Sequence, residues 1–214
     1  MSDAADRHER LHAELRDRIC LLDYAPGARL SEEALAREFG TSRTPLRRVL
    51  ARLEDEGLVQ SVHGVGTIVT DVDLAEMVQT YALRLELAQM VGVLSPRPVT
   101  AGLLSEMRAL KARGDGLVLA PDARVFARLN MDFFHFGLSL TDNEALREVS
   151  ERLYYRTARI WLKSIPRMDL ADEVARFDRE LSETLCALET GDTAAAALIR
   201  RAHISMSFAR LREA

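Results

Sequence analysis

Lysine and cysteine are nearly absent from this sequence. Lys111 and Lys163 are its only lysines, so almost all of the 29 basic residues are arginines. The planar guanidinium suits bidentate contacts with phosphates and base edges, although a high genomic GC content would produce the same bias. The two cysteines, Cys20 and Cys186, lie far apart with no Cys or His at the spacing of a metal site. A cysteine-based zinc site is therefore excluded, and both are expected to be small apolar core residues.

Long apolar runs are absent as well. No run approaches the length that spans a bilayer, and the N-terminal MSDAADRHERLHAELRDR is charged and lacks the apolar stretch of a signal peptide. The sequence therefore predicts a cytoplasmic protein without a membrane segment. Its 214 residues are 48% hydrophobic, which is typical of packed soluble proteins and is enough for one large domain or two small ones.

Residues 1–70 have the pattern of a small domain with three helices and a hairpin. Apolar residues recur at helical spacing in 11–22, and Pro26-Gly27 interrupts that helix. Ser31 is placed to cap a short second helix, and Gly57 to end a third. The runs LVQSV and GTIVT, joined through HGVG, indicate a β-hairpin. This order of elements is that of a winged helix-turn-helix.

Residues 71–214 show only helical patterns. The patterns are separated by SPRPV, GDGLVLAPD, LTDN, SIPRMD and TGD, and these breaks predict about six helices. The predicted fold class is therefore mainly α, with an N-terminal winged helix-turn-helix over 1–70 and an all-α helical bundle over 71–214.

Arginines are concentrated at the start of the expected third helix. Four of them fall within ten residues that contain no carboxylate: Arg43, Arg47, Arg48 and Arg52. Arg43 and Arg47 are four residues apart and share a helix face. In a helix-turn-helix this end enters the major groove, where Arg binds guanine and Thr44 can reach a base methyl or a phosphate. His63 and Gly64 lie at the hairpin tip, which could approach the DNA backbone.

The N-terminal domain is not basic overall, because residues 1–70 contain ten arginines and twelve Asp and Glu. The distribution of charge must therefore explain any affinity for DNA. Glu54, Asp55 and Glu56 cluster at the far end of the third helix, so the potential at its start can be positive within a Debye length. Phosphate contacts are then expected to dominate affinity and to make it salt-dependent.

The stretch PGARLSEEALAREFGTSRTPLRRVLARLEDEGLV, followed by GVGTIV, resembles the DNA-binding domain of the GntR family of bacterial transcription regulators over about residues 10–70. The resemblance implies a homodimer on a palindromic operator in double-stranded DNA. The contacts that it implies come from Arg43, Thr44, Arg47, His63 and Gly64. Two positions depart from the family pattern: Glu33 replaces a frequent DNA-contacting Arg, and Arg48, which could add a phosphate contact, replaces a usual Glu.

The helical remainder resembles the FCD ligand-binding domain of the FadR branch of that family. The segments FFHFGLSLTDNEAL and GDTAAAALIRRAHI carry this resemblance. It implies a divalent metal held by one Asp and three His, which helps to anchor a carboxylate effector. His135 and His203 match two of these ligands, whereas Met131 and Leu181 stand where the Asp and the middle His are expected.

Two alternatives follow for this domain. Asp132, three residues before His135, could complete a reduced zinc set of Asp132, His135 and His203, because three ligands and a water can hold zinc. Isolated histidines among apolar residues are more often core or pocket groups, which favours a domain with no metal cofactor in which His135 and His203 contribute to the effector pocket. In that case donors to a carboxylate effector are expected from four side chains on helices: Arg84, Tyr154, Arg156 and Arg159.

The sequence thus predicts a non-enzymatic, metabolite-responsive dimeric repressor, in which an effector changes the spacing of two recognition helices. One alternative is a metal-dependent or acid/base enzyme that uses Asp132, His135 and His203. It is disfavoured because no nucleophile motif, phosphate loop or paired carboxylates support it. A second alternative is an architectural DNA binder whose bundle responds to no effector.

Overall fold

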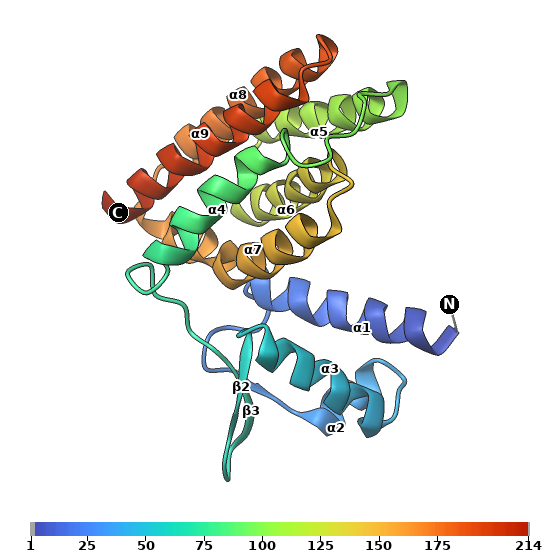
Figure 1. The fold of residues 1–214 in the computed structure, drawn as a ribbon. Helices are drawn as coiled ribbons and strands as arrows, with labels where there is room; N and C mark the ends of the chain where they lie inside the picture. The colour runs from blue at the N-terminus through green and yellow to red at the C-terminus, as the bar shows by residue number, and fades with distance from the viewer. Residues whose placement is uncertain (1–2, 214) are drawn as a thin grey trace. The chain divides into compact units, whose positions relative to one another are not determined.

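In the computed structural model, which describes residues 3–213, the chain forms two units, Met1–Asp73 and Leu74–Ala214 (Figure 1). Helices dominate both units, and the strands are confined to the first. The predicted fold class, a winged helix-turn-helix followed by an all-α domain, is confirmed. None of the helices in this described part of the chain combines the length and the apolar character needed to cross a bilayer.

The first unit contains three helices and a small antiparallel sheet. Its elements are α1 (Asp3–Cys20), β1 (Arg29–Leu30), α2 (Glu32–Glu38), α3 (Arg43–Asp55), β2 (Val59–Val62) and β3 (Gly66–Val69). The strand order is β1-β3-β2, with Arg29 opposite Ile68 and Val62 opposite Gly66. Strand β1 was not expected from the sequence, because two residues carry no alternation and their pairing depends on a distant strand.

Local signals explain where the helices of this unit begin and end. The Ser31 hydroxyl accepts a hydrogen bond from the backbone N–H of Ala34 at 3.3 Å, which satisfies a free donor at the start of α2. Gly57, just beyond α3, has φ +78°, a conformation that glycine adopts at little cost. The apolar sides of α1 and α3 then pack together, with Leu15, Ile19, Leu46 and Leu53 fully buried.

The second unit is a bundle of six α-helices within residues 74–213, as the sequence predicted. These are α4 (Val78–Met90), α5 (Ala101–Leu119), α6 (Ala123–Ser139), α7 (Glu144–Ser164), α8 (Leu170–Glu189) and α9 (Thr193–Glu213), with a short 3-10 turn, Ile165–Arg167, after α7. Helix α8 packs against both α5 and α9, and α4 packs against α7 and α9. Helices α4 and α9 therefore close one side of the bundle (Figure 1).

One expected helix break is shorter than the sequence suggested. The segment GDGLVLAPD does separate α5 from α6, but α5 continues through Gly114 and Gly116 to Leu119, so only residues 120–122 form the break. A Cβ atom at Gly114 would lie 2.7 Å from Leu181 Cδ1 and 2.8 Å from Asp178 Oδ1. Gly114 therefore allows α5 to approach α8 closely rather than ending the helix.

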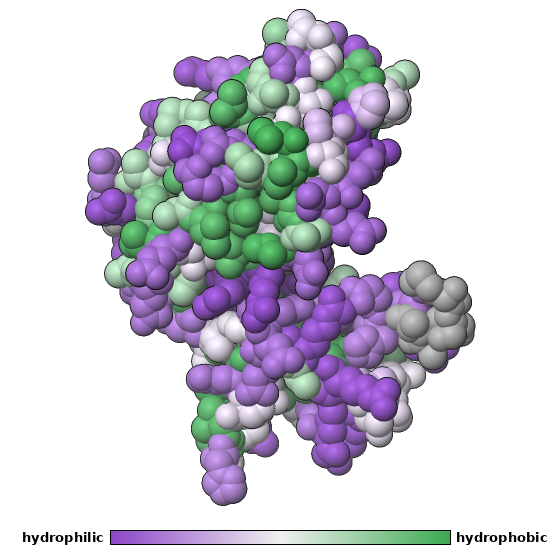
Figure 2. Space-filling view, in the orientation of Figure 1, coloured by the Kyte–Doolittle hydropathy of each residue, from purple (hydrophilic) through white to green (hydrophobic). Residues whose placement is uncertain are grey.

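Some apolar side chains of the second unit face outward. On α4, Val78 and Leu83 are 40% and 47% exposed, and α9 contributes the exposed Leu198 and Met206. Figure 2 shows apolar residues gathered on the face of this unit that carries α4. Contiguous apolar surface of this kind often marks a site of protein association.

Candidate nucleic-acid interface and effector cavity

The N-terminal end of α3 presents the arginines that the sequence singled out. The side chains of Arg43 and Arg47 are 60% and 62% exposed, and Thr44 and Arg48 are exposed beside them. Leu46, Val49, Leu50 and Leu53 are buried on the opposite side of the helix. Because burial of these residues fixes the rotation of α3, the basic side chains must face away from the core.

Glu32, in the first turn of α2, joins the two arginines. Its Oε2 atom accepts hydrogen bonds from Arg47 Nε at 2.8 Å and from Arg43 Nη2 at 3.2 Å. Partial burial opposes ionisation of Glu32, but the hydrogen bonds from Arg47 and Arg43 hold its pKa below the ordinary value. The carboxylate thus occupies the donors that a phosphate or a base edge would use. Sequence spacing could not reveal this contact, because the partners lie on different helices.

A groove runs from these residues to the wing, the β2–β3 hairpin. It is lined by β1, by the start of α2, by Arg43 and by residues of the wing, among them His63. Gly64 at the wing tip has φ +77°, and His63 and Gly64 are both exposed. Arg29, which sequence reasoning missed, also lines the groove, and its Nε lies 3.4 Å from the position of a Cβ on Gly66. The groove therefore brings Arg29, Arg43 and His63 together.

The acidic cluster at the other end of α3 has a structural role. Glu54 accepts hydrogen bonds from the backbone N–H of Ser61 at 2.6 Å and from its hydroxyl at 2.8 Å, which ties the wing to α3. Glu56 lies 2.8 Å from Nε2 of the buried His12 and 3.1 Å from Arg52 Nε. Burial tends to raise the pKa of Glu56, but the contacts with His12 and Arg52 outweigh it and lower that pKa.

The three residues of the reduced zinc set have other partners. Asp132 Oδ2 accepts a hydrogen bond from Arg113 Nη2 at 2.6 Å, His135 Nε2 contacts the Tyr155 hydroxyl, and His203 Nε2 lies 2.8 Å from Glu183 Oε2. Within residues 3–213 no three His, Cys, Asp or Glu side chains gather in a group that could hold a metal. The residues present therefore do not fit a metal ion, and no chemistry is assigned to one.

A polar cavity lies inside the bundle among α4, α6, α7, α8 and α9. Arg84, Tyr154 and His203, three of the residues predicted to bind the effector, line it together. The other three lie outside its lining: His135, Arg156 and Arg159. Two ion pairs missed by sequence reasoning border the cavity: Arg200 Nη1 lies 2.7 Å from Glu180 Oε1, and Arg210 Nη2 lies 3.0 Å from Glu173 Oε2.

Arg84 is bound by a hydroxyl and two aromatic rings, whereas Arg200 and Arg210 form ion pairs. Its Nη1 donates a hydrogen bond to the Thr157 hydroxyl at 2.6 Å, and the guanidinium carbon lies 5.0 Å and 5.2 Å from the ring centres of Tyr81 and Tyr154. These are cation–π distances. Burial above all, and also the nearby charge of Arg200, lower the pKa of Arg84. In the described part of the chain no carboxylate forms a hydrogen bond or an ion pair with this side chain.

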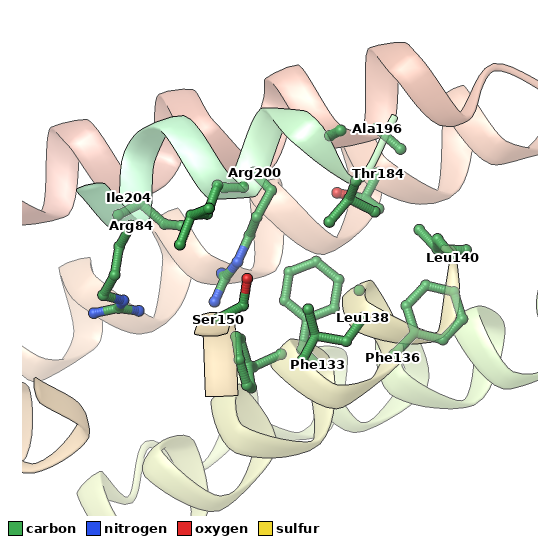
Figure 3. A pocket seen from close by; sticks show the side chains of 16 residues that line it. Arg84, Phe133, Phe136, Leu138, Leu140, Ser150, Thr184, Ala196, Arg200 and Ile204 are labelled. Atoms are coloured by element: carbon green, nitrogen blue, oxygen red, sulfur yellow. The ribbon is translucent and has the colours of Figure 1, made fainter. Parts of the chain in front are cut away.

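A second, mostly apolar cavity adjoins the first (Figure 3). Residues of α4, α6, α7, α8 and α9 line it, among them Phe133, Phe136, Leu138 and Leu140. Arg84, Arg200 and Ile204 line both cavities, so the two meet at these residues. The bundle therefore offers one elongated site with a charged region and an apolar region.

Comparison with known proteins covers both units. Residues 7–69 match the family of bacterial regulatory proteins named gntR, and residues 79–206 match the FCD domain. An HTH-type transcriptional regulator in an unstable DNA locus of Streptomyces ambofaciens is 43% identical over 74 residues, which are 35% of this chain and 31% of that protein. The Nta operon transcriptional regulator of Aminobacter aminovorans is 30% identical over 139 residues, 62% of this chain and 64% of that protein. The matches thus span less than two thirds of these relatives.

Two solved structures share the fold over nearly the whole chain. E. coli McbR/YncC superposes with a TM-score of 0.85 at 20% identity, covering 100% of this chain and 99% of the other. A transcriptional regulator GntR from Rhodococcus sp. RHA1 gives a TM-score of 0.77 at 20% identity, covering 98% and 99%. The FCD match alone covers more than half of the chain. The resemblance seen in the sequence is therefore confirmed: the chain belongs to the gntR family of bacterial regulatory proteins and carries an FCD domain.

Proposed function

We propose that this protein is a transcriptional repressor that binds double-stranded DNA through α3 and the wing and responds to a small carboxylate bound in its helical unit. One observation carries the DNA-binding part: Arg43 and Arg47 are exposed at the N-terminal end of α3, beside a groove that reaches Arg29 and His63. Arginines in this position suit guanine in the major groove, and the wing suits the backbone next to it.

A homodimer on a palindromic site is the second part of the proposal. A two-fold dimer presents two identical recognition helices, so each reads one half of the operator. The exposed apolar side chains of α4 and α9, including Val78, Leu83 and Met206, offer a surface for such an association. Light scattering of the purified chain is expected to give twice the chain mass.

The effector response is the third part. A carboxylate that enters beside Arg84 is expected to favour one arrangement of the dimer over the other. If the spacing of the two recognition helices in that arrangement does not match the spacing of the operator half-sites, the effector releases the repressor from DNA. The size of this response cannot exceed the difference between the affinities of the effector for the two arrangements.

The test begins with selection of bound duplexes from a random-sequence pool, followed by fluorescence anisotropy on the selected duplex. Arg47→Ala should weaken binding by about 5- to 150-fold, because loss of one good base contact costs roughly 1–3 kcal/mol. Arg108→Ala is the matched control, since Arg108 lies in the other unit and is also exposed. Recovery of no common sequence, or equal affinity of Arg47→Ala and wild type, would refute the DNA-binding role.

A further inference from the structure

The arginines that line the cavities of the helical unit do not all have a carboxylate partner among residues 3–213. Arg200 and Arg210 each have a carboxylate partner, Glu180 and Glu173. Arg84 is held instead by the Thr157 hydroxyl and two tyrosine rings. These three arginines, of which Arg200 and Arg210 are partly exposed, thus face two buried glutamates. One excess positive charge remains at Arg84, where the cavities meet. An uncompensated buried charge is costly, and a monoanionic group placed here would offset it.

The apolar cavity extends from Arg84 along α4. Leu87, Ala88 and Val91 line it from this helix, and Val91 lies about 10 Å beyond Arg84 at 1.5 Å per residue. In the view of Figure 3, Arg84 lies at one end, whereas Leu140 and Ala196 lie at the other. A chain of roughly eight carbon–carbon bonds of about 1.5 Å, in a zigzag, would span this length.

A tight backbone contact borders the far end of the apolar cavity. A Cβ atom on Gly92 would lie 2.6 Å from Ala194 Cα and 3.2 Å from Ala197 Cβ, so the turn that follows α4 packs directly against α9 just beyond Val91. No side chain in this contact can move aside to lengthen the cavity. The site should therefore limit the length of the chain that it accepts.

Two buried hydroxyls of the apolar cavity lack a partner in the described part of the chain, and the one nearer the arginines, Ser150, supports a ligand with a polar head group. Ser150 and Thr184 line the apolar cavity and are only 7% and 3% exposed. Neither hydroxyl oxygen has a hydrogen-bond partner among the described residues, and an unsatisfied buried hydroxyl costs about 1–3 kcal/mol. In Figure 3 Ser150 lies toward Arg200 and Thr184 toward Ala196. An oxygen of an acidic head group could accept a hydrogen bond from Ser150.

We infer that the helical unit binds a medium-chain aliphatic monocarboxylate, with its head group at Arg84 and its alkyl chain in the apolar cavity that extends to the contact of Gly92 with α9. This inference rests on the proposed function, because it names the chemical class of the effector. It requires both regions of the site: the excess charge at Arg84 selects the anion, and the apolar region selects the alkyl chain.

Calorimetric titration of the full-length chain with a series of straight-chain acids tests this inference. From butanoate to octanoate, each added CH2 should tighten binding about fourfold, since burial of a CH2 is worth about 0.8 kcal/mol. Dodecanoate should bind no more tightly than octanoate, because the contact of Gly92 with α9 blocks the path of a longer chain beyond Val91. Octanol and octylamine, which lack the negative charge, should bind at least tenfold more weakly than octanoate.

Variants identify the site. Arg84→Met should reduce the affinity for octanoate tenfold or more. Ala88→Leu should reduce the affinity for octanoate and leave the affinity for butanoate unchanged. Arg108→Met, at an exposed position on α5, should behave as wild type, and circular dichroism confirms that each variant is folded. Affinity that does not change with chain length, octanol as tight as octanoate, or unchanged binding by folded Arg84→Met would each overturn the inference.

Measurement of DNA affinity on the same samples separates this inference from the proposed function. If the chain binds its selected duplex but no acid in the series binds, the inference fails and the DNA-binding role stands. If octanoate binds with the expected dependence on length and no duplex is selected, the inference stands and the regulatory role fails.

Discussion

Glu32 Oε2 lies 2.8 Å from Arg47 Nε and 3.2 Å from Arg43 Nη2, so one carboxylate of α2 bonds both arginines at the start of α3. This arrangement holds the two side chains on the exposed face of the helix. It also occupies their donors with a negative group, which DNA would have to displace under the proposed function.

Glu32→Gln is therefore expected to increase affinity for a scrambled duplex several-fold and to reduce discrimination between selected and scrambled duplexes. The neutral amide competes more weakly for the guanidinium donors than a carboxylate does. Fluorescence anisotropy with both duplexes measures the change. Glu33→Gln removes the same charge from an exposed neighbour and is the control. An equal effect of the two substitutions would show that net charge, and not the contact of Glu32 with the arginines, is responsible.

Arg29→Ala tests the groove between α3 and the wing. Arg29 lies beside Gly66 rather than on α3, so we expect it to contact the DNA backbone and not a base. The substitution should weaken binding to selected and scrambled duplexes by similar factors, and the slope of log affinity against log salt should fall by about 1. Affinities measured over a range of salt concentrations test this. A loss confined to the selected duplex would instead assign Arg29 a base contact.

The sequence predicted the exposed face of α3 better than the lining of the cavity in the helical unit. Leucines at helical spacing determine which side of α3 is buried, so exposure of Arg43 and Arg47 follows from the local pattern. The contact with Glu32 and the groove position of Arg29 depend on how α2 and β1 lie against α3 and β3. That information lies in tertiary structure and has no local signal.

The effector site shows the limit of sequence reasoning more clearly. Arg84 and Tyr154 were predicted to bind the effector, and they do line one cavity. Arg156 and Arg159 are on the same helix as Tyr154, but a rotation of about 100° per residue places them on other sides. Arg200 was overlooked because arginines at helical spacing usually face solvent, whereas its ion pair with Glu180 allows it to line the cavity with only 16% of its side chain exposed.

Two glycines of α5 offer a matched test of helix packing. A Cβ at Gly114 would meet Leu181 Cδ1 at 2.7 Å, whereas a Cβ at Gly116 meets nothing within 4 Å. Gly114→Ala should lower the free energy of unfolding by about 1–3 kcal/mol, because the close contact with α8 must open. Gly116→Ala should raise it by up to about 1 kcal/mol through helix propensity. Urea denaturation compares the two, and a stabilising Gly114→Ala would contradict the role given to this glycine.

The pair formed by the buried His12 and the partly exposed Glu56 should make the stability of the first unit depend on pH. The pKa of Glu56 in the folded chain is lowered from its ordinary value of 4.5. Its ionised form therefore stabilises the fold above about pH 4.5, and this contribution is lost as the pH falls through the lower, folded-state pKa. Glu56→Gln should destabilise the unit by about 1–3 kcal/mol at pH 7.

The same substitution should cost much less once the pH is low enough to protonate Glu56 in the folded chain. Urea denaturation followed at several pH values from 7 downward measures the difference. Glu14→Gln is the control, because its side chain is 51% exposed and its ion pair with Arg18 lies at the surface. A Glu56→Gln penalty that stays constant with pH would mean that shape and packing at this position, and not the charge of Glu56, stabilise the contact between α1 and α3.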